Sequence, residues 1–241
     1  EVLEAFSQAA QQAGIPANED FNRGNNFGVG YFEVNQRSGW RWNTAKAFLR
    51  PIMKRPNLTV WTHAQVKNLS IERNPSGELV CNGAVVIKAG EEVVVKAVRE
   101  TVLCAGAIGT PQILELSGIG QGSLLQQHGI EVKLDKPGVG ANLQDHLQIR
   151  AVFKVQGVKT LNTLANSLWG KAQIGMEYVF KRSGPMSMAP SQLGAFTKSS
   201  ADRPYPNIQY HVQPLSLPAF GQPLHNFNAF TASVCNLNPT S

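Results

Sequence analysis

Cysteine is scarce in this chain, and its pattern excludes two classes of protein. The 241 residues include three cysteines, Cys81, Cys104 and Cys235. An odd number at wide spacing forms neither a disulfide framework nor a set of metal ligands. Cys104 and Cys235 lie in apolar, strand-like runs, where a thiol usually behaves as a small hydrophobic side chain. We therefore expect no metal site and a reducing, cytoplasmic location.

Long apolar runs and concentrated charge are also missing. No stretch comes near the roughly 20 apolar residues of a membrane-spanning helix, and no signal peptide is visible. Charged residues make up 16% of the chain, and the net charge of +6 is scattered in short clusters such as Lys181-Arg182. A nucleic-acid interface would gather basic residues on one face or one helix. The sequence therefore predicts neither a membrane span nor a nucleic-acid partner.

Two features of a whole nucleotide-binding enzyme are absent from these residues. The glycines between Gly24 and Gly30 lack the G-x-G-x-x-G spacing of a dinucleotide-binding turn, and no predicted strand and helix flank them. The chain also begins at Glu1 without a methionine, inside a helical pattern, and it ends at Ser241 directly after a strand-like run. We therefore expect an internal piece of a longer protein.

What is present is a folded, loop-rich sequence with 42% hydrophobic residues, 22 glycines and 14 prolines. Apolar residues at helical spacing predict helices, and short apolar or alternating runs predict strands. The predicted helices are residues 1–13, 44–53, 110–117, 123–128 and 161–180. The predicted strands are residues 28–34, 66–71, 80–87, a strand starting at 93, 102–104, 148–155, 207–213 and 229–236.

Residues 102–118 have the pattern of a strand that turns into a helix. Residues 102–104 read as a buried strand, Ala105-Gly106-Ala107 follow it, and Thr110-Pro111 predicts a helix start with Thr110 as the N-cap. Small residues let a ligand approach the backbone, and free N–H groups at a helix start favour a polar or anionic group. Many α/β crossings share this pattern, so these residues alone leave a ligand-binding and a purely structural role open.

A family resemblance adds to this pattern. The run GAIGTPQILELSGIG, from Gly106 to Gly120, resembles over its whole length the second signature of the glucose-methanol-choline (GMC) oxidoreductases. Residues 137–146, PGVGANLQDH, look like the segment that follows it in that family. Upstream, QRSGWR at 36–41 and RPNLTV at 55–60 resemble the family in the right order and distance. The similarity extends over nearly the whole chain and is looser in its C-terminal third.

The resemblance implies an α+β or α/β architecture with two parts. Residues 44–146 would belong to a Rossmann-like FAD domain, as a β-meander followed by a strand–turn–helix. Residues 1–43 and 147–241 would belong to a substrate domain, an antiparallel sheet backed by helices. The parent enzyme would be an FAD-dependent alcohol dehydrogenase or oxidase that oxidises a CH–OH group and passes a hydride to flavin N5.

The resemblance also implies positions that contact the cofactor. Val66 is the position whose backbone typically meets the adenine of FAD in this family. Cys104, Ala105 and Gly106 lie on the turn that approaches it. The bland interpretation, that Val66 is simply a strand residue, holds whether or not FAD is present.

No catalytic residue is assigned, because the catalytic histidine of the family and its partner belong to a C-terminal part that has no counterpart here. We expect His146 to pack at a domain boundary, and His63 and His128 to lie at the surface. For His211 and His225 a structural role is favoured over a place in the active-site wall.

The substrate and the activity of the chain itself leave alternatives. Choline enzymes of the family resemble one another in placing a glutamate on the strand where this chain has Arg150 and Lys154, which favours a neutral or anionic alcohol over choline. The parent is predicted to be an alcohol oxidoreductase; the alternatives are a lyase on the same fold or a non-catalytic remnant. We expect the isolated chain to be inactive, to bind FAD poorly, and to associate through exposed apolar patches and sheet edges or with missing segments.

Overall fold

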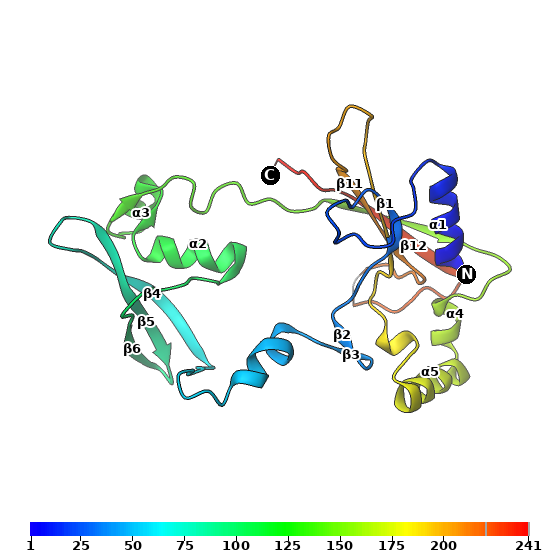
Figure 1. Ribbon diagram of the computed structural model, residues 1–241, viewed down its shortest axis with the longest axis horizontal. Helices are drawn as coiled ribbons and strands as arrows, with labels where there is room; N and C mark the ends of the chain where they lie inside the picture. The colour runs from blue at the N-terminus through cyan, green and yellow to red at the C-terminus, as the bar shows by residue number, and fades with distance from the viewer. Residues whose placement is uncertain (220, 241) are drawn as a thin grey trace. The chain divides into compact units, whose positions relative to one another are not determined.

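The computed structural model describes residues 1–219 and 221–240 (Figure 1). By their contacts these residues form two compact units. The first, which we call the sheet unit, consists of Glu1–Ile52 and Asp145–Pro239. The second, which we call the meander unit, is built on Met53–Gln144. The meander unit is thus inserted in the chain of the sheet unit. The assignment of these parts to a flavin domain and a substrate domain stays a prediction.

An antiparallel sheet with the strand order β1-β10-β11-β12-β9 forms the centre of the sheet unit. Four of its strands match the predicted ones closely, whereas the third in chain order, LGAFT, is short and rich in small residues, and it was not predicted. The strands are β1 (Gly28–Tyr31), β9 (Gln148–Lys154), β10 (Leu193–Thr197), β11 (Ile208–Gln213) and β12 (Ala229–Asn236).

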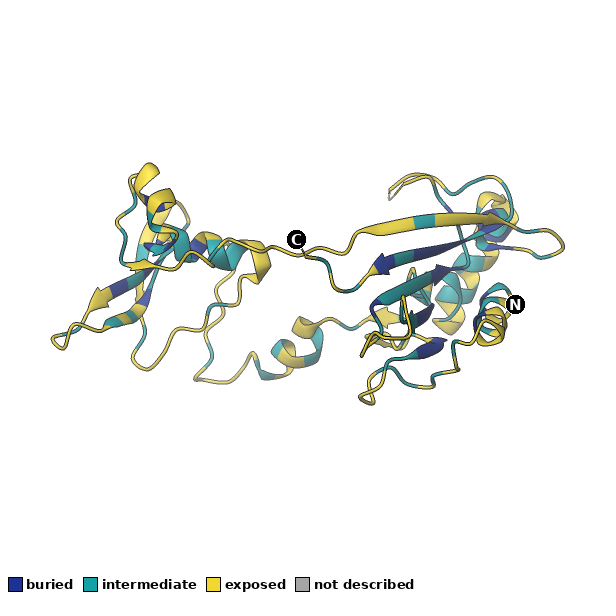
Figure 2. Ribbon diagram, turned by 90° about the horizontal axis from the view of Figure 1, so that it is seen from above, coloured by how far each residue is buried: buried dark blue, intermediate teal, exposed yellow. Residues whose placement is uncertain are grey.

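Helix α1 (Val2–Gln12) packs on one face of this sheet, as its helical spacing of apolar residues requires. Leu3 and Ala10 of the helix join a cluster with strand residues that have no exposed surface, among them Leu193 and Val212. Gly14, with φ of +89°, follows the end of the helix, where glycine is favoured because it adopts this conformation without strain. Figure 2 shows the buried residues concentrated in the inner strands, whereas β9 at the edge of the sheet is largely exposed.

The opposite face of the sheet carries mainly polar side chains, together with Phe196, which packs against Phe21 and Phe32. Because side chains alternate along a strand, Gln209 and His211 of β11 point away from the α1 cluster. Ser233 of β12 lies beside both His211 and Arg150 in the strand register. The sheet therefore presents an apolar face to its own helix and a mainly polar face, which we call the polar face, on the other side.

The stretch predicted as one helix over 161–180 is two helices, so that prediction is wrong at its middle. Helix α4 (Leu161–Asn166) ends before Ser167, and α5 (Leu168–Lys181) begins after it. Ser167 adopts an extended conformation, and its hydroxyl accepts a hydrogen bond from the backbone N–H of Gly170 at 2.9 Å. A serine N-cap stabilises a new helix start, and apolar periodicity alone does not reveal it.

Two side-chain amide groups, one buried and one partly buried, fix the loop between β11 and β12 to α4. The Asn162 side chain has no exposed surface; it donates to the carbonyl groups of Ser216 and His225 and accepts from the N–H of Ser216. The amide oxygen of Asn228 accepts hydrogen bonds from the backbone N–H of Thr160 and the hydroxyl of Thr163. The imidazole of His225 lies 3.0 Å from the Ser216 hydroxyl, which gives this histidine the structural role that was favoured.

A three-stranded antiparallel meander, β4-β5-β6, forms the second unit. Its strands are β4 (Ala64–Arg73), β5 (Leu79–Lys88) and β6 (Glu91–Lys96), in agreement with the predicted meander. Helix α2 (Gly106–Leu116) packs against it, and Leu69, Ile71 and Ile113 form the buried cluster between them. The core of this unit is therefore small.

Two side chains bond to backbone groups on the outer edge of β4. The backbone N–H of Leu69 donates to the buried hydroxyl of Ser117 at 2.8 Å. The ammonium group of Lys133 donates to the carbonyl oxygen of Ile71 at 2.8 Å. Free backbone groups on an edge strand invite pairing with other chains, and these two bonds satisfy one N–H and one carbonyl group of β4.

A short parallel pair completes the meander unit. β7 (Ile119–Gly120) pairs with β8 (Leu134–Asp135), and α3 (Gly122–Gln127) connects them. Gly118 has φ of +85°, and a Cβ there would lie 2.4 Å from the carbonyl oxygen of Glu131. Only glycine fits this turn, which explains the glycine that ends α2.

Two predictions about residues 102–110 are wrong. Residues 102–104 form no strand in the described part of the chain, and Val102 and Cys104 are exposed instead of buried. A buried strand needs neighbours on both edges, and no described strand pairs with these residues. Helix α2 begins at Gly106, four residues before the predicted start, so Thr110 is not its N-cap and Pro111 lies inside it.

The remaining elements belong to the sheet unit. The predicted helix at 44–53 is a π-helical turn followed by a 3-10 turn. A small hairpin precedes it. Among the described residues, no helix has the length and apolar character needed to cross a membrane. These elements are β2 (Gln36–Arg37), β3 (Trp40–Arg41), η1 (Ala45–Leu49), η2 (Arg50–Ile52) and η3 (Pro185–Ser187).

Candidate functional site

The N-terminus of α2 presents an open stretch of backbone. Ala105 and Gly106 are exposed, and Gly106 has φ of +81° with nothing within 4 Å of the place where a Cβ would lie. The hydroxyl of Thr110 accepts a hydrogen bond from the N–H of Ala105 at 3.1 Å. No side chain in the described residues caps the next N–H groups of the helix, which have no partner inside it. This turn therefore offers backbone donors to a polar or anionic group.

Val66 lies near the start of β4, opposite Val86 of β5. A β-bulge follows it, between Val66 and Asn68, and its side chain packs against the Leu69–Ile71–Ile113 cluster. Leu103, which directly precedes Cys104, packs against the same cluster. The structure thus attaches both predicted cofactor positions, Val66 and the 104–106 turn, to one small core. Contact of Val66 and of the 104–106 turn with FAD stays a prediction.

The three cysteines are free and differ in exposure. Cys235 is buried in β12, and burial raises the pKa of its thiol. Cys81 of β5 is partly buried, and its thiol lies 3.4 Å from the carbonyl oxygen of Gly83. Cys104 is exposed beside the start of α2. It is therefore the cysteine that a reagent in solution reaches most easily.

His211 is half-buried on the polar face of the sheet. Its Nδ1 lies 2.8 Å from the amide nitrogen of Gln148, and its ring lies 5.8 Å from that of Phe32. Burial lowers the pKa of His211, and the nearby charge of His146 lowers it further. Neutral imidazole is therefore favoured here. His146 and His211 both belong to the sheet unit. The described contacts of His211 are with Gln148 and Phe32, within that unit.

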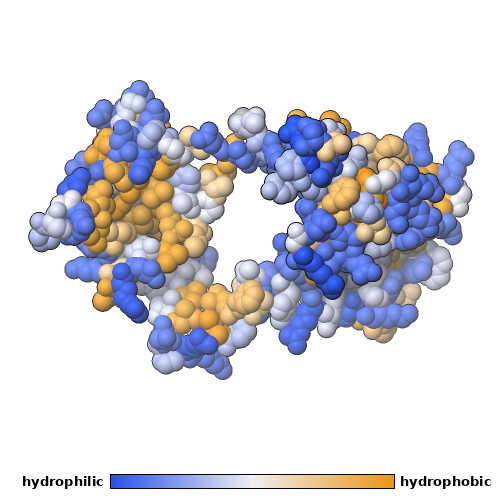
Figure 3. Space-filling view, turned by 45° about the horizontal axis from the view of Figure 1, so that its top comes forward, coloured by the Kyte–Doolittle hydropathy of each residue, from blue (hydrophilic) through white to orange (hydrophobic). Residues whose placement is uncertain are grey.

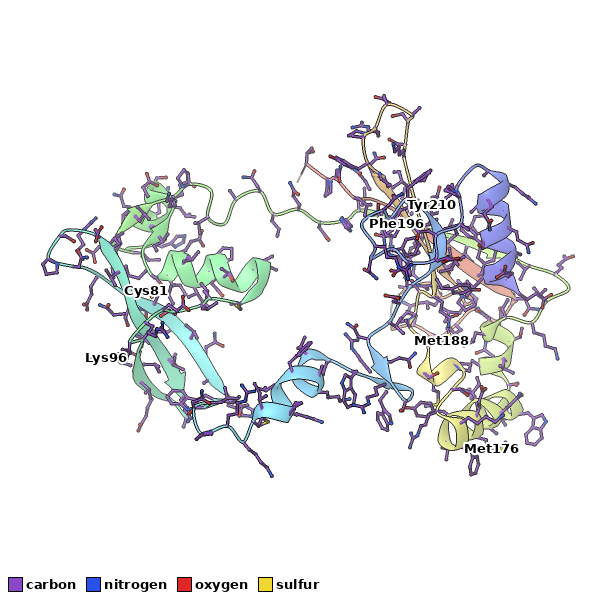
Figure 4. All side chains as sticks on the ribbon, viewed as in Figure 1. Cys81, Lys96, Met176, Met188, Phe196 and Tyr210 are labelled. Carbon is purple, nitrogen blue, oxygen red and sulfur yellow. The ribbon has the colours of Figure 1, made fainter. Side chains whose placement is uncertain are left out.

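Sequence reasoning missed a pocket of about 550 Å³ in the sheet unit. One wall is the segment around the β2–β3 hairpin, with Val34, Arg41 and Trp42, and the other is the loop after α5, with Met186 and Met188. Figure 4 marks Met188 in that loop. The volume is within the range of small-molecule sites. The only signal in the sequence was the alternation of tryptophan and basic residues in QRSGWRW.

The hairpin is held against α5. The hydroxyl of Tyr178 donates to the carbonyl oxygen of Gly39 at 3.3 Å, and the guanidinium of Arg182 lies 5.1 Å from the centre of the Trp40 ring. A Cβ at Gly39 would lie 2.3 Å from the carbonyl oxygen of Arg182, so the close approach requires glycine. The β2–β3 hairpin, which forms one wall of the pocket, is thereby fixed to α5. The loop that follows α5 forms the other wall.

The meander unit exposes a large amount of apolar surface. Figure 3 shows apolar side chains gathered over this unit. Val98 is fully exposed, Ile108 is 74% exposed and Val102 is 73% exposed. Apolar surface gathered in this way commonly marks an interaction site. The prediction of exposed apolar patches is therefore confirmed.

Comparison with known proteins identifies the family. The sequence profile of the GMC oxidoreductases matches residues 2–148. The chain belongs to the GMC oxidoreductase family. Among curated relatives, "Alcohol dehydrogenase [acceptor]" of Pseudomonas putida is 36% identical over 98% of this chain. "Oxygen-dependent choline dehydrogenase" of Brucella anthropi is 36% identical over 97% of it. The chain spans 42% and 41% of these two relatives, respectively.

Solved structures agree on the fold. A crystal structure of formate oxidase superimposes with a TM-score of 0.82, at 23% identity, over 99% of this chain and 45% of that one. Pyridoxine 4-oxidase from Mesorbium loti superimposes with a TM-score of 0.75, at 26% identity, over 99% of this chain and 42% of that one. This GMC chain is a mixed α/β structure with antiparallel sheets that corresponds to part of those proteins. That the meander unit belongs to a Rossmann-like FAD domain stays a prediction.

Proposed function

We propose that this GMC chain is part of an FAD-dependent oxidoreductase that acts on the CH–OH group of an alcohol. The observation that supports it most directly is the match of the family profile to residues 2–148, which include the signature from Gly106 to Gly120. In this proposal the meander unit belongs to the Rossmann-like FAD domain. The sheet unit belongs to the substrate domain, with its polar face toward the substrate.

The residues of the α2 turn fit the adenosine end of FAD. Ala105 and Gly106 are small and exposed, the backbone N–H groups at the helix start are available, and the cluster beneath Val66 is apolar enough to support a flat ring. In the complete protein the flavin would supply the two-electron oxidation, by hydride transfer to its N5. The proposed role of the described residues is to bind and orient the cofactor, and the residues that exchange the proton are not assigned here.

Alkylation of Cys104 tests the cofactor contact on this chain, at FAD and ADP concentrations high enough to compensate for the weak binding expected of the isolated chain. Iodoacetamide should react first at Cys104, because Cys81 is partly buried and Cys235 is buried. FAD and ADP should slow that reaction and leave Cys81 unaffected, whereas FMN, which lacks the adenosine, should not. The Gly106→Val variant should lose the protection, because φ of +81° disfavours a branched side chain. Equal rates with and without FAD would refute adenosine binding at this turn.

The activity itself is tested on the full-length protein that contains this chain. A visible absorbance spectrum recorded with the intact mass shows whether flavin is bound. Anaerobic addition of an alcohol should bleach the flavin bands in the full-length protein. A full-length protein with flavin bands that no alcohol bleaches would contradict alcohol oxidation.

A further inference from the structure

The pocket between the hairpin and the loop after α5 has an unusual distribution of charge. Arg41 is its only charged lining residue, and no aspartate or glutamate occurs among the described residues that line it. Just outside, the guanidinium of Arg37 lies 5.3 Å from the centre of the Trp42 ring. The ammonium of Lys46 lies 6.0 Å from the same ring and donates to the carbonyl oxygen of Arg41. Three cations therefore surround the wall of the pocket.

The aromatic groups of this wall are already engaged. A quaternary ammonium ligand is usually held by open aromatic faces, often with a carboxylate nearby. Here the ring of Trp42 has two cations of the chain over it, and Trp40 has Arg182 at 5.1 Å and Lys46 at 5.8 Å. A cationic ligand would find no carboxylate in the pocket and would be repelled by charges only a few ångströms from the wall.

The remaining lining suits an apolar body that ends in a hydroxyl. Val34, Met186, Met188 and Pro190 supply apolar surface, and methionine side chains adapt to ligands of different shape. The side-chain amides of Asn35 and Asn43 also line the pocket and can donate or accept a hydrogen bond. The combination is typical of small-molecule sites, in which an apolar lining binds and a few polar groups orient.

We propose that this pocket binds the body of the substrate, and that the substrate is an alcohol with an apolar body and no positive charge. This proposal rests on the proposed function, alcohol oxidation, and adds the chemical class of the alcohol. It separates this chain from the choline dehydrogenases among its relatives. Arg41, Trp42 and Lys46 are the residues that exclude a cation, through repulsion and through occupation of the indole faces.

The four methionines allow a direct test on the chain without flavin. Met186 and Met188 line the pocket, whereas Met53 and Met176 do not, so their ¹³C-labelled methyl groups report pocket and control positions in one NMR spectrum. The probes share one body: benzyl alcohol, 4-(hydroxymethyl)benzoate and 4-(hydroxymethyl)benzyltrimethylammonium. The neutral and anionic probes should shift Met186 and Met188 saturably and leave Met53 and Met176 unchanged. The cationic probe should bind at least about tenfold more weakly.

Reversal of charge provides the matched variant. Arg41→Glu should bring the affinity for the cationic probe to that of the neutral one or above it, and Arg55→Glu, in the meander unit, should change nothing. Cationic binding as tight as neutral binding in the unaltered chain would overturn the proposal. So would the absence of a saturable shift at Met186 and Met188 with every probe. Neither readout depends on flavin, so failure here is distinct from failure of Cys104 protection or of flavin bleaching.

Discussion

The sheet unit and the meander unit bury their apolar side chains to different degrees. In the sheet unit, strand residues such as Leu193, Ala195 and Val212 have no exposed surface, and α1 covers them. In the meander unit, three buried residues form the cluster beneath α2, while Val98 and Ile108 face solvent. The sheet unit thus has a core of its own, whereas the meander unit has an apolar surface suited to further contacts. We expect the two to respond differently to substitution.

The largest expected effect is in the core of the sheet unit. Leu193→Ala should lower the free energy of unfolding by about 2–5 kcal/mol, because it leaves a cavity under α1. Urea unfolding followed by circular dichroism measures it. Leu168→Ala is the matched control, since Leu168 is 88% exposed. Equal effects of the two substitutions would mean that the cluster under α1 does not hold this unit together.

Two glycines of α5 test how closely the periphery of the sheet unit is packed. A Cβ at Gly170 would lie 2.0 Å from the carbonyl oxygen of Leu164, whereas a Cβ at Gly175 would meet nothing within 4 Å. Gly170→Ala should therefore destabilise by about 1–3 kcal/mol through overpacking. Gly175→Ala should stabilise by about 0.5–1 kcal/mol, because alanine favours a helix. Thermal unfolding distinguishes them, and the same sign for both would contradict the packing at the α4–α5 junction.

In the meander unit the corresponding test is a hydrogen bond. Ser117→Ala removes the acceptor of the buried Leu69 N–H, which should cost about 1–3 kcal/mol. Because the unit has a small core, hydrogen exchange of β4 should accelerate while that of β11 and β12 stays unchanged. Ser123→Ala, at an exposed position of α3, serves as the control. Accelerated exchange throughout both units would show that they do not respond independently.

The smallest expected effect concerns pH and His211. Burial, and secondarily the charge of His146, lower the pKa of His211 below its usual 6.5. In the window from 6.5 down to the lowered pKa, the unfolded chain binds the proton more readily, so stability falls as the pH falls. His211→Gln should reduce this loss, whereas His63→Gln, at an exposed site, should leave it unchanged. Urea midpoints at several pH values measure it, and identical pH profiles for all three proteins would exclude His211 as the source.

Local sequence signals were sufficient for elements that are stabilised within the chain. Apolar alternation predicts the meander β4-β5-β6, and helical spacing predicts helix α1. The preference of helix ends for glycine accounts for Gly14 and Gly118. Residues 102–104 have the composition of a buried strand, yet composition contains no information about whether a pairing strand is present. The break at Ser167 and the early start of α2 depend on side-chain hydrogen bonds, to Gly170 and Ala105, that apolar patterns do not encode.

The candidate site was only partly predictable for a similar reason. The motif from Gly106 to Gly120 pointed to an exposed turn at the start of α2, and that turn is present. The pocket lined by Trp42 and Met188 brings together residues far apart in the sequence. Tertiary contacts of this kind leave no local pattern, so the alternation of tryptophan and basic residues was the only trace of it.

The insertion of one unit inside the other has a consequence for synthesis on the ribosome. β1 pairs with β10, and all of Met53–Gln144 is translated between them. The meander of β4, β5 and β6 is joined by short turns, so it can close as soon as it emerges. Val29 of β1 can bond to Pro16 and Asn18 at once, but the backbone groups of β1 that face β10 stay unpaired until β10 has been made. During that interval β1 presents an open strand edge, with which other chains can pair.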